Sequence, residues 1–338
     1  MNLVLRADGG LAQGAGHLMR CLSLASALRE RGAVCRFIGR AEPGHALQLV
    51  ADAGFALHHL PVEPGPLDEA ADAAATAALL QRWPASDWLL VDHYRLGLAW
   101  EQALRPWVRR LAVIDDLSDR AHDADLLLDQ NLDSGGLRQR PGLLPAPCQR
   151  LIGPAYALLR PEFAELRAQH AGPAGRHTAL RRLLVFYTAG HDLGETWKAL
   201  QGVAGFAAQA RRAGLPPLQV DVVAGPANPQ QAEISALCTQ WGWTLHGQTP
   251  HIAQLMAEAD LALGAGGASN WERCALGLPA LVTVLAENQA AVAQALHQAG
   301  AVRCLGWGHR LSAADYHQAL AALDGPTLQA LAKRAATL

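Results

Sequence analysis

The chain has 338 residues, 51% of them hydrophobic and 17% charged, which predicts a globular protein large enough for two hydrophobic cores and excludes a disordered chain. Its formal net charge of -2 leaves no surplus of cations for a phosphate backbone, so we expect no nucleic-acid partner. No apolar run reaches the roughly 18 residues that a membrane-spanning helix needs, so we expect no membrane insertion.

Short apolar runs alternate with helix-length segments through the first half of the chain. A strand at residues 3–6, a helix at 16–31 and a strand at 34–38 follow the rhythm of a βαβ unit, which predicts a parallel sheet. Further buried strands are predicted at 88–91, 111–114 and 126–128, and acidic side chains follow them: Asp92, Asp115, Asp116 and Asp129. Open α/β sheets bind ligands at the carboxyl ends of their strands, so we expect functional residues at this edge.

A change of composition divides the chain in two. Residues 169–182 are rich in Ala, Gly, Pro, His and Arg without periodicity, and a second series of strands follows at 183–187, 219–223, 244–245, 261–263 and 280–284. We therefore expect two domains, 1–170 and 181–338. Each combines a doubly wound, Rossmann-like α/β sheet with a glycine turn, and two such domains facing a cleft form the architecture of the glycosyltransferase B (GT-B) type.

The first glycine turn is followed at once by a histidine. Gly14 and Gly16 leave room for a ligand, and His17 lies in the first turn of a predicted helix, so its ring should point toward the glycine turn. The positive end of the helix dipole favours the neutral imidazole, which can act as a general base. The alternative is that His17 only caps the helix or packs locally.

Three polar side chains follow the strand at 88–91. Asp92, His93 and Tyr94 are predicted at the ligand edge, where an imidazole and a phenol can donate to sugar hydroxyls or acetamido oxygens. Each can equally be a buried polar group whose hydrogen bonds are satisfied within the protein. Asn131 follows the next predicted strand but one and is assigned to the same substrate-binding set.

Asp115 and Asp116 form a pair of carboxylates after another predicted strand, and such pairs can hold a metal ion. No histidine accompanies them at ligand spacing, and aspartates at strand ends more often cap helices or orient loops. We therefore predict no metal and no cofactor.

The second glycine turn lies between the strand at 261–263 and a helix-like run. Backbone N–H groups of Gly266, Gly267 and Ala268 can close on the oxygens of a diphosphate, because glycine leaves no side chain in the way. Another helix is predicted to begin at residue 287, which brings the amides of Asn288 and Gln289 to the same edge. This segment is the predicted diphosphate site.

Two interpretations remain open for Ser269 and Glu272. Their spacing is that of a capping box, in which the serine accepts from the helix backbone and the glutamate reaches back. Alternatively, the Glu272 carboxylate accepts hydrogen bonds from both hydroxyls of a ribose, and Ser269 contacts the nucleotide. In the first loop of the second half, Gly190 and His191 are expected to border the diphosphate.

In chain order these motifs resemble those of the PseG family, bacterial UDP-sugar hydrolases of pseudaminic acid biosynthesis. In the first half the resemblance rests on Arg6-Ala7-Asp8, Gly14-x-Gly16-His17, Val91-Asp92-His93-Tyr94 and the segments 113–117, 127–131 and 153–163. In the second half it rests on the segments 264–267, 271–274, 276–279 and 286–289. The family belongs to the route to nonulosonic acids that glycosylate flagellin.

The resemblance implies hydrolysis of UDP-2,4-diacetamido-2,4,6-trideoxy-β-L-altropyranose to UDP and the free sugar. In that family water attacks the anomeric carbon with inversion, and no metal is required. By the same resemblance His17 is the general base, Tyr94 a catalytic tyrosine of the cleft, Glu272 the ribose contact and Asn288 an amide beside the nucleotide sugar. Asp8 joins the substrate-binding set because it belongs to a matching motif.

One loop departs from the family pattern. The second half of the family normally begins with Gly-Gly-x-Asp followed shortly by Asn, whereas this chain has Ala189-Gly190-His191-Asp192 and then Glu195. An alanine side chain in place of a glycine pushes the loop away from the diphosphate. The resemblance therefore leaves the exact sugar open.

Three other functions remain open. A UDP-sugar glycosyltransferase of the same fold would pass the sugar to an acceptor, although no basic amphipathic helix indicates a membrane-bound acceptor. A nucleotide-sugar 2-epimerase would need further acid-base groups, for which Asp115 and Asp116 are candidates. A UDP-sugar-binding module without activity would leave His17 unexplained.

The expected partner is a small UDP-sugar. Six cysteines are scattered without C-x-x-C pairs, which argues against a zinc site or a disulfide framework and favours reduced thiols. With no targeting segment recognised, we expect a cytoplasmic protein that is a monomer or a weak oligomer.

Overall fold

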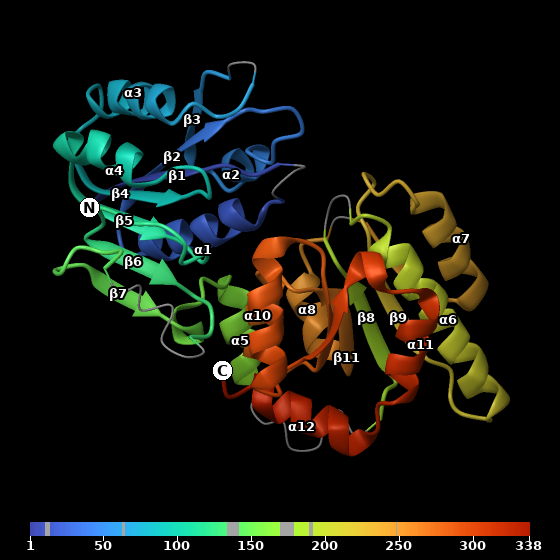
Figure 1. Ribbon diagram of the computed structural model, residues 1–338. Helices are drawn as coiled ribbons and strands as arrows, with labels where there is room; N and C mark the ends of the chain where they lie inside the picture. The colour runs from blue at the N-terminus through green and yellow to red at the C-terminus, as the bar shows by residue number, and fades with distance from the viewer. Residues whose placement is uncertain (11–13, 63–64, 134–141, 170–178, 189–191, 248) are drawn as a thin grey trace. The chain divides into compact units, whose positions relative to one another are not determined.

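The structure is a computed structural model that describes residues 1–10, 14–62, 65–133, 142–169, 179–188, 192–247 and 249–338 (Figure 1). The chain forms two compact units, Met1–Pro161 and Glu162–Leu338. Helix α5 (Pro161–Gln169) begins at the boundary and belongs to the second unit, in which Arg167 donates to the carbonyl oxygens of Ala275 and Ala336 at 3.2 and 3.0 Å.

A parallel sheet of seven strands forms the centre of the first unit, in the order β3-β2-β1-β4-β5-β6-β7. The strands are β1 (Asn2–Ala7), β2 (Val34–Arg40), β3 (Ala56–Leu60), β4 (Ser86–Asp92), β5 (Val108–Ile114), β6 (Leu126–Asp129) and β7 (Gln149–Ile152). The helices are α1 (Gly16–Glu30), α2 (Gln48–Asp52), α3 (Glu69–Leu80) and α4 (Leu98–Leu104).

Helices cover both faces of this sheet (Figure 1). On β1, Leu3 and Leu5 pack into one core with residues of α1 and α2, whereas Val4 packs into the other core with residues of α3 and α4. Successive side chains of a strand point to opposite faces, so a strand between two helical layers is apolar at nearly every position. This is why continuous apolar runs predicted the central strands.

The second unit has a parallel sheet of six strands in the order β10-β9-β8-β11-β12-β13. The strands are β8 (Arg182–Phe186), β9 (Gln219–Val223), β10 (Thr244–His246), β11 (Leu261–Ala265), β12 (Ala280–Val284) and β13 (Arg303–Trp307). The helices are α6 (Glu195–Arg212), α7 (Gln231–Trp241), α8 (Ile252–Glu258), α9 (Ser269–Ala275), α10 (Glu287–Gln298), α11 (Ala313–Ala321) and α12 (Gly325–Ala335). Within the described ranges, no helix has the length and apolar character needed to span a membrane.

Both sheets are wound in two directions from a central pair of strands. In the first sheet the chain runs outward from β1 to β3 and then returns to β4 on the other side of β1, and the second sheet does the same from β8 to β11. The carboxyl ends of β1 and β4, and of β8 and β11, are therefore topological switch points, where such sheets bind ligands. The predicted class, α/β with two doubly wound Rossmann-like units, is confirmed.

The sequence did not predict β3, β7 and β13, and all three lie at sheet edges. None of them is continuously buried, and in β7 two of the four residues are exposed. An edge strand has one side without a neighbouring strand, so it lacks the uninterrupted apolar run of a central strand.

Candidate functional site

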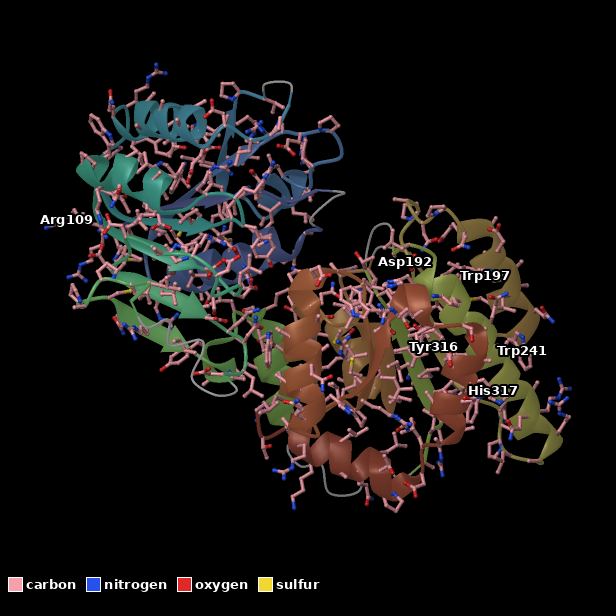
Figure 2. All side chains as sticks on the ribbon, in the orientation of Figure 1. Arg109, Asp192, Trp197, Trp241, Tyr316 and His317 are labelled. Atoms are coloured by element: carbon pink, nitrogen blue, oxygen red, sulfur yellow. The ribbon has the colours of Figure 1, made fainter. Side chains whose placement is uncertain are left out.

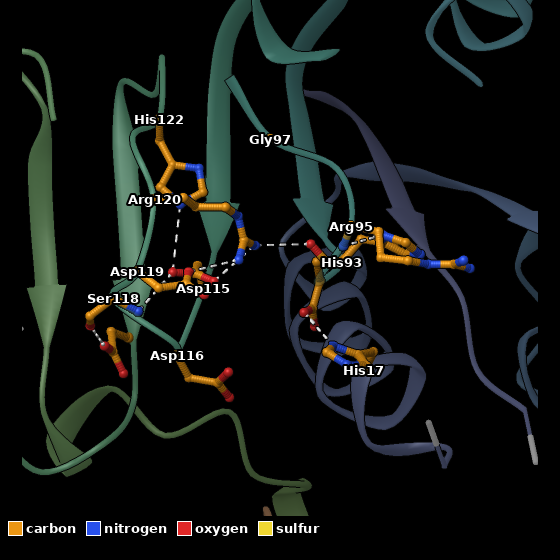
Figure 3. Close-up of polar contacts among 12 residues, drawn as sticks. His17, His93, Arg95, Gly97, Asp115, Asp116, Ser118, Asp119, Arg120 and His122 are labelled. Carbon is orange, nitrogen blue, oxygen red and sulfur yellow. Dashed lines mark hydrogen bonds and ion pairs between the residues drawn. The ribbon is translucent and has the colours of Figure 1, made fainter. Parts of the chain in front are cut away.

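The first switch point gathers the polar residues that follow β1 and β4. Asp8 comes after β1, Asp92 and His93 stand at the end of β4, and His17 approaches from the first turn of α1. The exposed fractions of these four residues lie between 0% and 5%. Figure 3 shows the ring of His17 directed at the end of β4.

A buried carboxylate holds the imidazole of His17. Oδ1 of Asp92 lies 2.6 Å from Nδ1 of His17, and the Arg20 guanidinium donates to both oxygens of Asp92 at 2.5 Å. Arg20 also donates to Asp116 at 2.9 Å. Burial acts to raise the pKa of Asp92, but Arg20 and His17 outweigh burial and hold that pKa well below its usual range. Asp92 is therefore a permanent acceptor for the ring N–H.

The carboxylate sets the tautomer of His17. When Nδ1 carries the proton that Asp92 accepts, Nε2 keeps its lone pair, and within the described residues the polar contacts of His17 use Nδ1. Tyr94 packs edge-on against the ring, with centroids 4.5 Å apart at 81°. A histidine backed by a carboxylate is the arrangement of a general base, because the carboxylate stabilises the imidazolium formed when Nε2 takes a proton.

A second set of ion pairs holds His93. The fully buried Arg6 donates to Asp8 at 2.5 and 2.9 Å and to Asp72 at 2.6 and 3.2 Å. Asp8 in turn lies 3.3 Å from Nε2 of His93, whose Nδ1 accepts the N–H of Arg95 at 3.0 Å. Burial lowers the pKa of His93 in spite of Asp8, so the ring is neutral at pH 7. Asp8 thus serves to join β1 to His93.

Arg120 links this layer to the loop after β5. Its guanidinium donates to the carbonyl oxygen of His93 at 3.2 Å and pairs with Asp115 at 2.9 Å (Figure 3). Behind Asp115, the buried His122 lies between two carboxylates, 2.6 Å from Glu101 and 3.5 Å from Asp115. Burial acts to lower the pKa of His122, but hydrogen bonds to Asp115 and Glu101 outweigh it and raise the pKa. Among the described residues, no group of three or more His, Cys, Asp or Glu is placed to hold a metal ion.

The structure changes the interpretation of several predicted substrate contacts. Four of them are at most 5% exposed: Asp8, Asp92, His93 and Asn131. Tyr94 is half-buried and Gly16 is exposed, whereas Gly14 exchanges two backbone hydrogen bonds with Gly10. We expected His17 to point toward the glycine turn; the contacts found are those with the end of β4. The buried Asp92 and Asp8 hold the rings of His17 and His93 in place.

Sequence reasoning missed Arg20, as it missed Asp72 and Arg120. Arg20 lies one turn after His17 on α1 and is 5% exposed. The next residue, Cys21, donates its thiol to Asp92 at 3.6 Å. The signal was the spacing, because Arg20 lies three positions after His17 on the same face of the predicted helix, and a guanidinium that is buried there requires a carboxylate partner.

At the second switch point, the glycine turn continues from the end of β11. A Cβ on Gly267 would meet only Nε2 of Gln289, at 3.7 Å, whereas a Cβ on Gly266 would meet the Ala293 side chain at 3.2 Å. Gln289 also accepts the N–H of Leu285 at 3.0 Å. The structure therefore brings Gln289 beside the two glycines, as the sequence predicts, and leaves space on Gly267.

The capping box expected as one alternative for Ser269 and Glu272 does not form. Helix α9 begins at Ser269, and its N-cap residue is Ala268, which makes no side-chain capping hydrogen bond. Glu272 is half-buried on α9, and Asn288 is exposed in the first turn of α10. The role of Glu272 as a ribose contact stays a prediction.

Gly190 and His191 lie outside the described residues. Asp192, which follows them, is 1% exposed and accepts the N–H groups of Gly194 and Thr196 at 3.0 and 2.9 Å. Its carboxylate thereby satisfies donors at the start of α6, and Figure 2 labels it there.

Comparison with known proteins gives structural matches only. No family model and no curated protein sequence matches the chain. The structure of MurG from Acinetobacter baumannii matches with a TM-score of 0.67 and 16% identity, over 99% of this chain and 94% of that one. The structure of UDP-GlcNAc 2-epimerase from Neisseria meningitidis bound to UDP-GlcNAc matches with a TM-score of 0.59 and 12% identity, over 98% and 94%. The Streptomyces glycosyltransferase SsfS6 in complex with thymidine diphosphate matches with a TM-score of 0.60 and 14% identity, over 100% and 96%.

The chain has the GT-B fold. The matches cover almost the whole chain, so they include both doubly wound units. At these identities the likeness shows the fold alone, and the same fold carries different reactions. The reaction is therefore argued from the residues at the switch points.

Proposed function

We propose that the chain is a hydrolase that releases UDP from a UDP-sugar, with His17 as the general base that activates water. The pair of His17 and Asp92 at the first switch point carries this proposal. The carboxylate is fully buried and doubly paired with Arg20, so it is fixed before any substrate arrives. A fixed carboxylate keeps the proton on Nδ1 and presents Nε2 as the acceptor.

The reaction requires one proton acceptor and a stable leaving group. Water attacks the anomeric carbon, the C–O bond to the diphosphate breaks, and Nε2 of His17 takes the proton of the water. UDP departs as an anion that is already stable in water, so the acid of the carboxyl pair in ordinary glycosidases is dispensable. Attack opposite the leaving group inverts the anomeric carbon. No metal takes part in this scheme.

The two units have separate roles in this proposal. In the first unit, Tyr94 packs on the base and its phenol donates to the sugar. The nucleotide is assigned to the second unit, with contacts from Gly266, Gly267, Ala268, Ser269, Glu272, Asn288 and Gln289. Amide groups fixed around the diphosphate stabilise the charge that develops on it as the C–O bond breaks.

The substrate we propose is UDP-2,4-diacetamido-2,4,6-trideoxy-β-L-altropyranose or a close UDP-sugar. The motifs shared with the PseG family favour this sugar, and because the sequence of segment 189–192 departs from the family pattern, the proposal includes a related sugar. The matches to an epimerase bound to UDP-GlcNAc and to a glycosyltransferase bound to thymidine diphosphate support a nucleotide-linked substrate.

A UDP-sugar glycosyltransferase is the second candidate. The matches to MurG and to SsfS6 favour it, because SsfS6 is a glycosyltransferase of the same fold. The same base would then deprotonate an acceptor hydroxyl in place of water.

Incubation with a panel of UDP-sugars in heavy-oxygen water separates these candidates. The hydrolase proposal expects UDP release without an acceptor, label in the free sugar, and activity that survives a chelator. Label in UDP would mean attack at phosphorus and would contradict the mechanism. Release of UDP only when an acceptor is added would identify a transferase.

His17→Ala tests the base directly. We expect turnover to fall by about 10²–10⁴-fold while UDP affinity stays unchanged. His59→Ala is the matched control, because His59 is exposed on the edge strand β3. Unchanged turnover in a folded His17→Ala protein removes His17 from the mechanism.

A further inference from the structure

Arg273 places a guanidinium at the second switch point. A Cβ on Gly264, near the end of β11, would lie 2.6 Å from Nη1 of Arg273 and 2.5 Å from the carbonyl oxygen of Phe186. The absence of a side chain at Gly264 therefore makes room for the guanidinium. Nη2 donates to the carbonyl oxygen of Ala265, the last residue of β11, at 2.8 Å. Gly264 pairs with Phe186 across β11 and β8, so the cation lies beside the boundary of these two strands.

Among the described residues no carboxylate lies within ion-pair distance of Arg273, and the neighbouring Glu272 acts on its charge only through a longer-range electrostatic interaction. Nη2 also donates to the neutral Oδ1 of Asn270 at 2.5 Å, and Nε of Arg273 and Nδ2 of Asn270 have no hydrogen-bond partner there. Arg273 is 1% exposed and Asn270 is 0% exposed. Burial lowers the pKa of Arg273 to about 10, which leaves the group charged at neutral pH.

The other guanidinium groups at the switch points are paired. Arg6 is held by two aspartates and Arg20 by two others. Such pairing is expected, because a buried cation without a counter-ion destabilises the folded protein. Arg273 departs from this pattern at the edge where a doubly wound sheet binds its ligand. An anionic ligand at this edge would supply the counter-charge that the protein omits.

We propose that Arg273 is the counter-charge for the diphosphate of a nucleoside diphosphate bound at the β8–β11 switch point. This proposal rests on the proposed function and names the group that recognises the charge of the UDP part. Asn270 contributes by being neutral, since an aspartate there would pair with Arg273 internally. The carbonyl that Arg273 holds belongs to Ala265, so the guanidinium acts from the same turn as the backbone amide of Gly267, whereas the N–H of Gly266 is donated to the carbonyl oxygen of Thr283 at 3.0 Å.

Calorimetric titration of the full chain with UDP and with uridine tests the charge recognition. Arg273→Met should raise the dissociation constant for UDP by about tenfold or more and change that for uridine by no more than about twofold, because only UDP carries the diphosphate. Arg273→Lys should retain part of the preference for UDP. Arg182→Met is the matched control: it removes a guanidinium at the opposite end of β8, where Asp221 and Glu258 pair with it.

A purely structural role for Arg273 would weaken the binding of UDP and of uridine by the same factor. If the ratio of the two affinities is the same in Arg273→Met as in the wild type, the proposal is overturned. If Arg273→Met does not fold, Asn270→Asp decides. This variant gives the guanidinium an internal carboxylate. The melting temperature should stay the same or rise, the affinity for UDP should fall, and the affinity for uridine should not change. Unchanged UDP affinity in Asn270→Asp overturns the proposal.

The outcome is separable from that of the hydrolase proposal. A protein that hydrolyses no UDP-sugar but prefers UDP through Arg273 keeps this inference and loses the hydrolase. A protein that hydrolyses UDP-sugars with an Arg273-independent preference for UDP keeps the hydrolase and loses this inference. A wild-type protein that binds no UDP contradicts both.

Discussion

Replacing Asp92 by asparagine keeps the shape of the side chain and removes the charge that holds His17. In the wild type the two oxygens accept from Nδ1 of His17 at 2.6 Å and from Nε and Nη2 of Arg20 at 2.5 Å. An amide offers one acceptor oxygen, so its N–H groups face one of these donors. The variant therefore disturbs both the orientation of the ring and the charge beside it.

The expected loss of activity follows from the charge of the imidazolium. The charge centres of Asp92 and a protonated His17 lie about 4 Å apart, which at an effective dielectric constant of about 20 corresponds to ~4 kcal/mol. Without the carboxylate the barrier rises by about this amount, so kcat falls by about 10³-fold. Arg20 keeps only Asp116 as a partner, and breaking a buried ion pair costs about 3–5 kcal/mol of stability.

The assay is steady-state UDP release at neutral pH, with UDP affinity and the melting temperature measured on the same protein. Asp125→Asn is the control, because it makes the same change in the pair between Asp125 and Arg105 at the amino end of β6. It should leave kcat unchanged. A folded Asp92→Asn protein with kcat within about threefold of the wild type would refute the reasoning.

Three further predictions concern stability and nucleotide binding. His122→Gln should lower the melting temperature most below pH 6.5, because two carboxylates stabilise the protonated ring of His122 in the wild type. The difference from the wild type should shrink as the pH rises through the raised pKa of His122. A difference that does not depend on pH would contradict this prediction. Gly267→Ala should weaken UDP binding and leave the melting temperature unchanged. Gly264→Ala should lower the melting temperature, because its Cβ would lie 2.5 Å from a backbone oxygen. Equal melting temperatures for the two variants would contradict this prediction. Glu272→Ala should weaken UDP binding more than it lowers the melting temperature, because Glu272 does not form a capping box with Ser269 at the start of α9; a large drop in melting temperature with intact UDP affinity would contradict the ribose contact.

The central strands could be predicted from the sequence, whereas of the four edge strands only β10 was predicted. Strands such as β4 and β11 are buried between two helical layers. Burial on both faces requires consecutive apolar residues, which appear in the sequence as a continuous apolar run. β13 reads Arg-Cys-Leu-Gly-Trp, its register against β12 shifts, and Gly306 has φ 102°. Such a strand forms by pairing with its single neighbouring strand, and its sequence shows neither a continuous apolar run nor an alternating pattern.

The positions of the site residues along the sheet were predictable, but their partners were not. The ends of predicted strands place Asp8, Asp92 and His93 at one edge. That Asp92 meets His17 depends on how α1 packs against β4, across 75 positions of sequence. Likewise, nothing in the pattern around Arg273 distinguishes a charge on a helix surface from one that enters the space beside a glycine.

The thiol of Cys21 has a practical consequence. Burial and the adjacent Asp92 raise its pKa well above the ordinary value, so the thiolate that reacts with electrophiles is suppressed beside the proposed base. Cys35, Cys148, Cys238 and Cys274 are also buried, and Cys304 alone is partly accessible. A maleimide dye should therefore attach at a single position on β13 and report on the second unit without modifying the thiol beside the proposed base.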